Sequence, residues 1–94
     1  MATEMTVARN LVKKAIDAGY KISVYDGEEY PVKKSRNFTE ITRALASTDQ
    51  DILVIRDLDG LRIGRILLVY GNSPEELIAD HTDNEAINAL CELS

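Results

Sequence analysis

The only histidine of the chain, His81, lies beside Asp80 and Asp83, and these residue types can bind a metal ion. Imidazole and carboxylate groups form mixed nitrogen and oxygen sites, which Asp57 or Asp59 would complete if the fold brought them nearby. A metal-assisted hydrolase is therefore one hypothesis. The same segment is also the polar turn that precedes a capped helix, so the sequence predicts no metal site and no cofactor.

The segment Asp57-Leu58-Asp59-Gly60 begins like a calcium-binding loop. Such a loop needs a third acidic ligand and a bidentate glutamate at its twelfth position. The twelfth position counted from Asp57 is Leu68. The segment is therefore interpreted as a turn.

Nucleophilic catalysis has little support in the sequence. Cys91, the only cysteine, follows Leu90 and has no base beside it that would activate the thiol. The serines lack the flanking glycines that expose a nucleophile, and only His81 would serve as their base. The sequence predicts a protein that is not an enzyme.

A phosphate site is also weakly supported. The backbone amides of Gly71-Asn72-Ser73 would bind an anion if a helix began there. Glu75 and Glu76 follow at once and would repel it. This segment is interpreted as a turn.

Basic and aromatic residues in the middle of the chain predict a small surface that would bind nucleic acid. This function is the alternative to the one favoured below. The residues are Lys33, Lys34 and Arg36, with Tyr25 and Tyr30 nearby and Arg62 and Arg65 as an extension.

Charge is distributed unevenly along the chain. Residues 66–94 contain six acidic residues and no Lys or Arg, although the net charge of the whole chain is only −5. This acidity counts against broad binding to nucleic acid or a membrane surface, because both are polyanionic. It favours a protein-binding module with an acidic C-terminal face. The predicted contact residues are Glu75, Glu76, Asp80, Asp83 and Glu85.

Size and composition favour a binding module as well. A chain of 94 residues with 45% hydrophobic side chains is expected to form a single domain over residues 1–94. The longest apolar run, Ile66 to Tyr70, is too short to cross a bilayer, and the N-terminus lacks the plan of a signal peptide. With one cysteine, these features predict a soluble, cytoplasmic protein.

The first half of the chain predicts a helix and a hairpin. Apolar residues at helical spacing predict a helix from Glu4 to Ala18 that ends at Gly19. A strand with Ile22 and Val24 inward should follow, with a tight turn at Asp26-Gly27. The return strand is expected over Glu28 to Lys33, with Tyr30 and Val32 inward, and Pro31 predicts that it is an edge.

The second half repeats this pattern. Asn37 and Glu40 form a capping box for a helix from Phe38 to Ser47, whose buried stripe is Phe38, Ile41, Ala44 and Leu45. Ile52 to Ile55 predicts a central strand, and Leu61 to Tyr70 its partner. Gly60 should close the loop between them in a left-handed conformation.

The C-terminal segment leaves two interpretations open. Residues 75–81 form either a short strand, placed at Glu76 to Asp80, or part of a helix. Thr82 with Glu85 predicts the start of a final helix that continues to about Leu93 and carries Ala86, Ile87 and Leu90 on its apolar side.

These elements predict an α+β fold. Its order is helix, hairpin, helix, hairpin, an optional strand and helix, with a mainly antiparallel sheet of four to five strands and the helices on one face. The strands at Pro31 and at Leu77-Ile78 are expected to be sheet edges, through which a homodimer is possible.

Several segments resemble a group of small uncharacterised proteins encoded by tailed bacteriophages and prophages. They are Asp26-Gly27-Glu28-Glu29, the run from Thr48-Asp49-Gln50-Asp51 to Asp57, Leu68-Val69-Tyr70-Gly71-Asn72, and Glu76-Leu77-Ile78-Ala79-Asp80 with Thr82-Asp83-Asn84. The resemblance spans most of the chain and implies an accessory protein in a bacterial cytoplasm, whose protein partner is host-encoded. It implies no chemistry.

Overall fold

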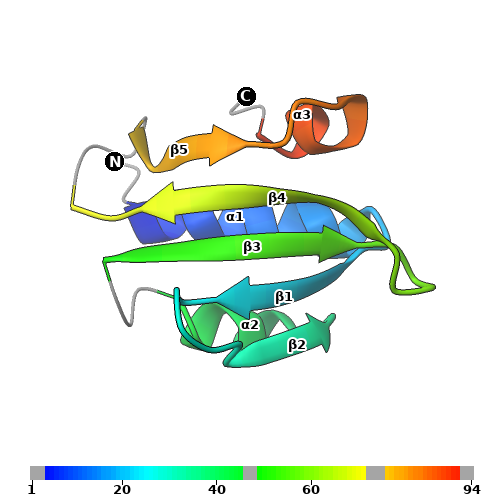
Figure 1. Ribbon diagram of the computed structural model, residues 1–94, viewed down its shortest axis with the longest axis horizontal. Coiled ribbons are helices and arrows are strands. Elements are labelled where there is room, and N and C mark those ends of the chain that lie inside the picture. The colour runs from blue at the N-terminus through cyan, green and yellow to red at the C-terminus, as the bar shows by residue number, and fades with distance from the viewer. Residues whose placement is uncertain (1–3, 46–48, 72–75, 92–94) are drawn as a thin grey trace.

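Helices cover one face of a five-stranded antiparallel sheet and leave the other face open (Figure 1). The computed structural model describes residues 4–45, 49–71 and 76–91. Within these residues the strands follow the order β2-β1-β3-β4-β5, and every neighbouring pair is antiparallel. The predicted α+β class is confirmed. The strands are β1 (Lys21–Tyr25), β2 (Val32–Ser35), β3 (Gln50–Arg56), β4 (Arg62–Val69) and β5 (Ile78–His81), and the helices are α1 (Glu4–Asp17), α2 (Phe38–Arg43) and α3 (Glu85–Cys91).

Helix α1 supplies the central part of the core. Its predicted stripe is confirmed, because Ala8, Leu11, Val12 and Ala15 are buried. Gly19 follows the helix with a φ of +91°, and its N–H donates to the Ile16 carbonyl, as a left-handed C-terminal glycine does.

The three middle strands face this helix with alternate residues, as a half-buried sheet requires. The inward residues Ile22, Leu53, Ile55 and Ile66 are all fully buried in one core cluster. Val54 is also buried, at 5% exposure, but it lies outside that cluster because it points to the open face. The predicted central position of the strand at residues 52–55 is confirmed.

Helix α3 packs directly on the backbone of β4. A Cβ atom on Gly64 would lie 2.6 Å from Cγ1 of Ile87, so only glycine permits this approach. The prediction that Thr82 caps this helix is wrong. Asn84 does so, because its Oδ1 accepts from the N–H of Ile87 at 2.8 Å, whereas Thr82 Oγ1 accepts from the Arg65 N–H on β4. The final residues of the predicted helix, 92 and 93, lie outside the described residues.

The hairpin between β1 and β2 differs from the predicted tight turn. Val24 pairs with Val32, so residues 26–31 form a longer loop and the return strand begins four residues later than predicted. Pro31 therefore precedes the strand instead of lying in it. Tyr30, predicted to point inward, is 43% exposed. Asp26-Gly27 lies in the connection between the two strands, as predicted. Asp26 organises a longer loop there, and not a two-residue turn.

Helix α2 begins where it was predicted. The Asn37 side chain accepts from the Glu40 N–H at 3.0 Å, which confirms the cap. Ile41 and Leu45 are buried, but Phe38 is 40% exposed, so its predicted place in the core is wrong. The helix ends at Arg43, earlier than predicted, and residues 46–47 lie outside the described residues.

The two edge strands are both short. Strand β5 resolves the C-terminal ambiguity in favour of a strand, two residues later than the predicted start. β2 and β5 are the sheet edges, as predicted, and each contains a register irregularity and charged residues, which discourage pairing with another sheet. A homodimer through these edges stays a prediction.

Candidate functional site

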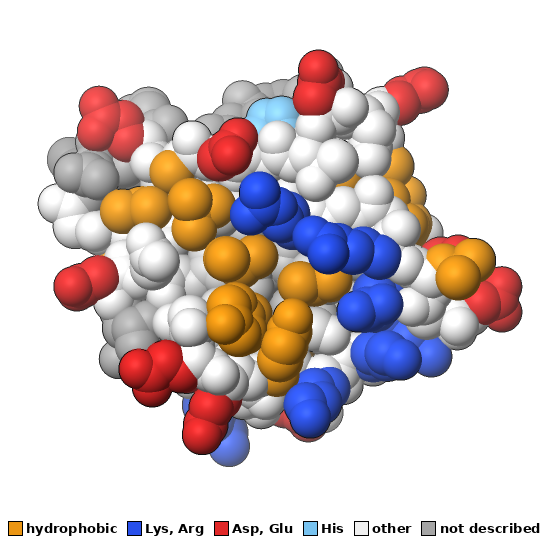
Figure 2. Space-filling model, in the orientation of Figure 1, with side chains coloured by type: hydrophobic (Ala, Val, Ile, Leu, Met, Phe, Trp, Pro, Cys, Tyr) orange, Lys and Arg blue, Asp and Glu red, His pale blue; other side chains and the backbone are white. Residues whose placement is uncertain are grey.

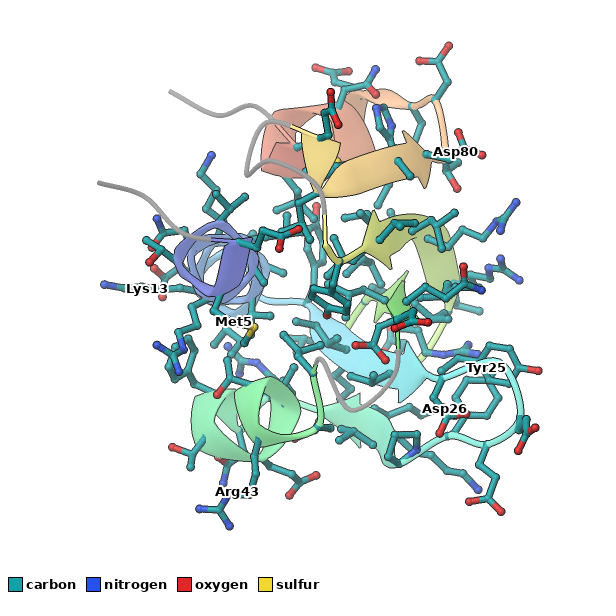
Figure 3. All side chains as sticks on the ribbon, turned by 90° about the vertical axis from the view of Figure 1, so that its left-hand side faces the viewer. Met5, Lys13, Tyr25, Asp26, Arg43 and Asp80 are labelled. Carbon is teal, nitrogen blue, oxygen red and sulfur yellow. The ribbon has the colours of Figure 1, made fainter. Side chains whose placement is uncertain are left out.

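The open face of the sheet is where side chains from all five strands meet solvent. Residues in register on neighbouring strands point to the same face, so Tyr25, Ile52, Leu67 and Asp80 form one row across four strands. Figure 3 shows Tyr25 and Asp80 on this side and Lys13 and Arg43 on the opposite, helix-covered side. A ligand of this face therefore meets side chains of the strands and of the loops that join them, and no helix.

Basic side chains gather at one end of the open face, although they are scattered through the sequence. Lys21 pairs with Arg56, which pairs with Arg62, so these three point the same way. Figure 2 shows the Lys and Arg side chains as a row beside a group of hydrophobic side chains. We call this row the basic arc. Its members are Lys21, Lys33, Lys34, Arg56, Arg62 and Arg65.

A bulge in β2 contributes both lysines to the arc. Lys33 and Lys34 together lie opposite Ser23, since the register shifts between Val24 and Ile22. Ser23 is buried, and its Oγ accepts from the Lys34 N–H at 2.9 Å, which satisfies the bulged backbone. Lys34 adopts a φ of +48°, the left-handed conformation that a bulge tolerates.

The arc closes over the loop that joins β3 and β4. Nη1 of Arg56 donates to the Gly60 carbonyl at 2.9 Å, and a Cβ atom on Gly60 would lie 3.6 Å from Lys34 Nζ. Asp57 shapes the loop, because its Oδ1 accepts from the N–H groups of Asp59 and Leu61. Gly60 has a φ of +88°, which confirms its predicted left-handed conformation. The loop thus holds cations from two strands at one place.

A pair of tyrosines lies at the β1–β2 side of the face. The rings of Tyr25 and Tyr30 have centroids 4.8 Å apart and are tilted by 42°, a favourable geometry for two aromatic rings. The Tyr25 hydroxyl donates to the Gly27 carbonyl at 2.9 Å, so one ring is tied to the loop. Tyr30 remains substantially exposed. We call these two residues the tyrosine pair.

Asp26 holds the loop that carries Tyr30. Its Oδ1 accepts from the N–H groups of Glu28 and Glu29, at 2.9 and 2.8 Å. These backbone donors favour the ionised carboxylate and hold the pKa of Asp26 below its usual value. The loop is therefore a defined structure that presents Tyr30 beside Tyr25.

Arg36, the third residue of the predicted nucleic-acid surface, has a different position. Its Nη2 donates to the Ile16 carbonyl at 3.0 Å, at the C-terminus of α1, where a cation is favourable. Lys33 and Lys34 instead lie in the basic arc, together with Arg62 and Arg65.

The predicted acidic residues lie around β5 and the start of α3. Glu76, Asp80, Asp83 and Glu85 are all exposed, whereas Glu75 lies outside the described residues. Asp80 projects from the open face, and Asp83 accepts from the Asn88 side chain at 3.0 Å. We call Glu76, Asp80, Asp83 and Glu85 the acidic end.

The residues considered above for a metal site, and Cys91 as a nucleophile, lie within the described part of the chain. No set of three or more His, Cys, Asp or Glu side chains in residues 4–45, 49–71 and 76–91 could hold a metal ion. Nδ1 of His81 lies 3.1 Å from the Thr82 carbonyl. Burial raises the pKa of the Cys91 thiol, while the charge of Lys14 lowers it by less, so this thiol is not activated.

A hydrogen bond between buried Asp51 and half-buried Tyr70 is not among the sequence-based predictions. Asp51 is fully buried at the start of β3, and the Tyr70 hydroxyl donates to its Oδ2 at 2.7 Å. The available signal was the alternation of Asp51 with Leu53 and Ile55, which places the carboxylate on the inward face. Tyr70 is half-buried, so the pair joins the interior to the surface, and its role is structural.

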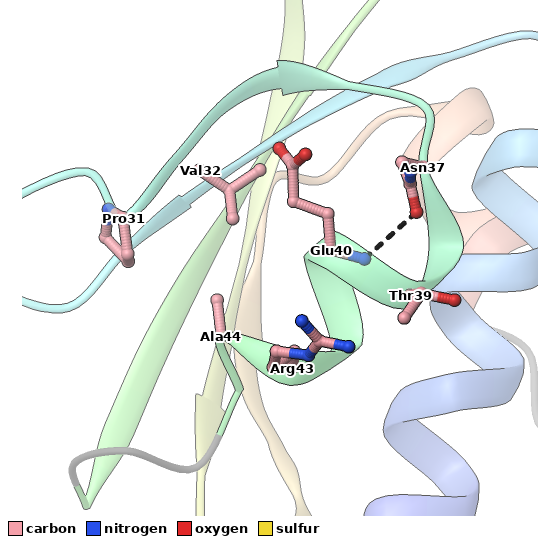
Figure 4. A pocket seen from close by; sticks show the side chains of 7 residues that line it. All are labelled: Pro31, Val32, Asn37, Thr39, Glu40, Arg43 and Ala44. Carbon is pink, nitrogen blue, oxygen red and sulfur yellow. Dashed lines mark hydrogen bonds between the residues drawn. The ribbon is translucent and has the colours of Figure 1, made fainter.

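A hollow of about 490 Å³ lies between β2 and α2 (Figure 4). Its lining mixes one acid and one base, Glu40 and Arg43, with Pro31, Val32 and Ala44. The amide oxygen of Asn37, which also lines it, is already engaged in capping α2. The hollow therefore has no net charge that would select a ligand.

Two members of the basic arc, Lys21 and Arg56, were not among the predicted site residues. Alternation along β1 and β3 would have placed both on the open face, but only the strand register aligns them with each other. That register depends on long-range pairing, which local patterns do not encode.

An antiparallel sheet with one open, basic face defines this molecule as an α+β protein with a candidate binding face. Comparison with protein-family models, curated proteins and solved structures finds no match to the chain. Among the described residues, none of the helices has the length and apolar character needed to cross a bilayer. The function is therefore inferred from the physical properties of the open face.

Proposed function

We propose that the protein is a binding module without catalytic activity, and that its open sheet face binds nucleic acid through the basic arc. The observation that carries this proposal is the convergence of six Lys and Arg side chains from four strands on one end of one face. Neutralising phosphates with such side chains is the main source of affinity for nucleic acid.

The net charge of −5 does not oppose this proposal. Electrostatic attraction over a few ångströms depends on local charge, because salt screens interactions beyond about 8 Å at physiological ionic strength. Residues 66–94 contain no Lys or Arg and six acids, so much of the negative charge comes from the C-terminal third of the sequence. The basic arc therefore creates a locally positive potential on a protein whose net charge is negative.

The test measures binding of a labelled mixed-sequence oligonucleotide, single-stranded and duplex, by fluorescence anisotropy over a range of salt. We expect the affinity to fall steeply with salt. The variant K33Q/R62Q/R65Q removes three exposed arc charges. It should bind at least about tenfold more weakly at low salt, with a salt slope reduced by roughly 2, since each phosphate contact contributes about 0.7 to 0.9.

A matched control removes the same charge from the helix-covered side. R9Q/K13Q/R43Q changes three exposed basic residues of α1 and α2 and gives the same net charge as the arc variant. It should bind as the unmodified protein does. Equal losses in both variants, or no binding of either oligonucleotide at micromolar protein, would contradict the proposal.

A second candidate function is protein binding through the acidic end. Four exposed carboxylates on or next to β5 and α3, in a stretch without any Lys or Arg, support it. Such a surface complements a basic patch on a partner and steers its approach. Since Asp80 also borders the open face, one partner could contact both.

Affinity capture tests this second candidate. The immobilised chain should retain a stoichiometric protein from a bacterial lysate, and E76Q/D80N/E85Q should lose it. The control D17N/E40Q/D59N removes three exposed carboxylates elsewhere and should retain the partner. A partner that is captured equally by both variants would exclude the acidic end as the contact.

The cellular setting is part of the same proposal. We infer a bacterial cytoplasm and a phage or prophage origin, on the basis of the single cysteine and the resemblance described above. A small module that binds nucleic acid or a host protein without chemistry of its own is consistent with an accessory role.

A further inference from the structure

We infer that the open face prefers single-stranded nucleic acid, whose unstacked bases contact the tyrosine pair and the apolar residues next to the basic arc. This inference deepens the proposed function and rests on it. It adds the state of the nucleic acid and the residues that receive the bases.

The arc and the apolar residues are neighbours on the same strands. Arg65 and Leu67 are two residues apart on β4, as are Arg56 and Val54 on β3, so the Cα atoms within each pair lie about 7 Å apart and both side chains point to the same face. Tyr25 extends this apolar row on β1, in register with Ile52. A nucleotide spans both, with its phosphate on the arc and its base over the apolar row.

The tyrosine pair provides the aromatic surface that unstacked bases need. Tyr30 is 43% exposed, and Tyr25 and the hydrogen bonds of Asp26 hold it in place. An aromatic ring that is already ordered loses little conformational freedom when a base stacks on it. Each such stacking contact is sequence-tolerant, because every base has a π-face.

Negative charge beyond the tyrosine pair determines which side of the bound nucleic acid faces the tyrosines. Glu28 and Glu29 are exposed in the loop next to Tyr30, and they repel phosphates from that side. The phosphate backbone is therefore confined to the arc, and its bases point toward the tyrosines. In a duplex the bases are paired and stacked inside the helix, so the same face would contact only phosphates.

Competition between single-stranded and duplex oligonucleotides of the same sequence tests the inference. The single strand should bind more tightly, with quenching of tyrosine fluorescence. Y30A should lose about 5- to 100-fold in affinity for the single strand, as expected when one stacked base is lost. Y30F should retain affinity, and F38A, which removes an exposed aromatic ring from α2, should have no effect.

The salt dependence separates the inference from the proposed function. Y30A should leave the salt slope and the duplex affinity unchanged, since it removes no charge, whereas K33Q/R62Q/R65Q should reduce both. Equal affinity for the two oligonucleotides, or a Y30A variant that binds the single strand normally, would overturn the inference but leave the proposed function intact. Competition by poly-glutamate as effective as by the oligonucleotide would instead indicate an acidic protein as the ligand and overturn both.

Discussion

Replacing Gly64 with alanine is expected to lower the free energy of unfolding by about 1–3 kcal/mol, the usual cost of forcing an extra methyl group into a packed core. The new Cβ would lie 2.6 Å from Cγ1 of Ile87 and 3.0 Å from Cβ of Thr82. Ile87 is fully buried, so it has no free space into which to move. Urea denaturation followed by circular dichroism measures the change.

A double-mutant cycle identifies the cause of that loss. I87A alone should cost about 2–5 kcal/mol, because it leaves a cavity. Combined with G64A, it should cost about 0.5–3 kcal/mol less than the sum, since the new methyl group occupies part of that cavity. Leu90, buried on the same helix, is the control, and L90A should be additive with G64A. Additivity of G64A with I87A would show that α3 does not pack on Gly64 in this way.

Tyr70→Phe is expected to destabilise the fold by about 1–3 kcal/mol, because it removes a hydrogen-bond donor from a buried carboxylate. The Tyr70 hydroxyl donates to Oδ2 of Asp51 at 2.7 Å, and Asp51 is fully buried. Loss of the donor removes a hydrogen bond from a buried polar oxygen. Chemical denaturation of the variant measures the effect.

Tyr25→Phe is the matched control for that measurement. It removes the same hydroxyl group from a tyrosine on the same sheet, but this hydroxyl donates to the exposed carbonyl of Gly27. Water replaces the lost donor there, so the change in stability should stay within about 0.5 kcal/mol. Similar losses in the two variants would mean that the buried carboxylate does not depend on Tyr70.

Local signals in the sequence were sufficient for most of the fold. The helical stripe of α1, the Asn37 cap and the left-handed Gly60 each depend on residues within a few positions of one another, and each prediction is confirmed. The errors arose where tertiary contacts compete with local ones. Thr82 is a good cap by type, but its hydroxyl accepts from Arg65 on β4, so Asn84 caps α3 instead.

Fewer residues of the candidate site could be predicted from local patterns in the sequence. Lys33 and Lys34 stood out as adjacent charges, whereas Lys21 and Arg56 are 35 positions apart and meet only through the pairing of β1 with β3. The sequence pattern predicts Tyr30 in the core because it predicts too short a hairpin loop. The length of that loop depends on the register of Val24 with Val32. A site assembled across strands cannot be read from neighbours along the chain.

The basic arc and the acidic end belong to different elements of the fold, so opposite charges gather at different places on a molecule of modest net charge. A polyanion such as the nucleic acid proposed above would attract the arc and repel the acidic end, so it would favour encounters in which the arc comes first. Orientation during the encounter raises the association rate without adding a contact to the complex.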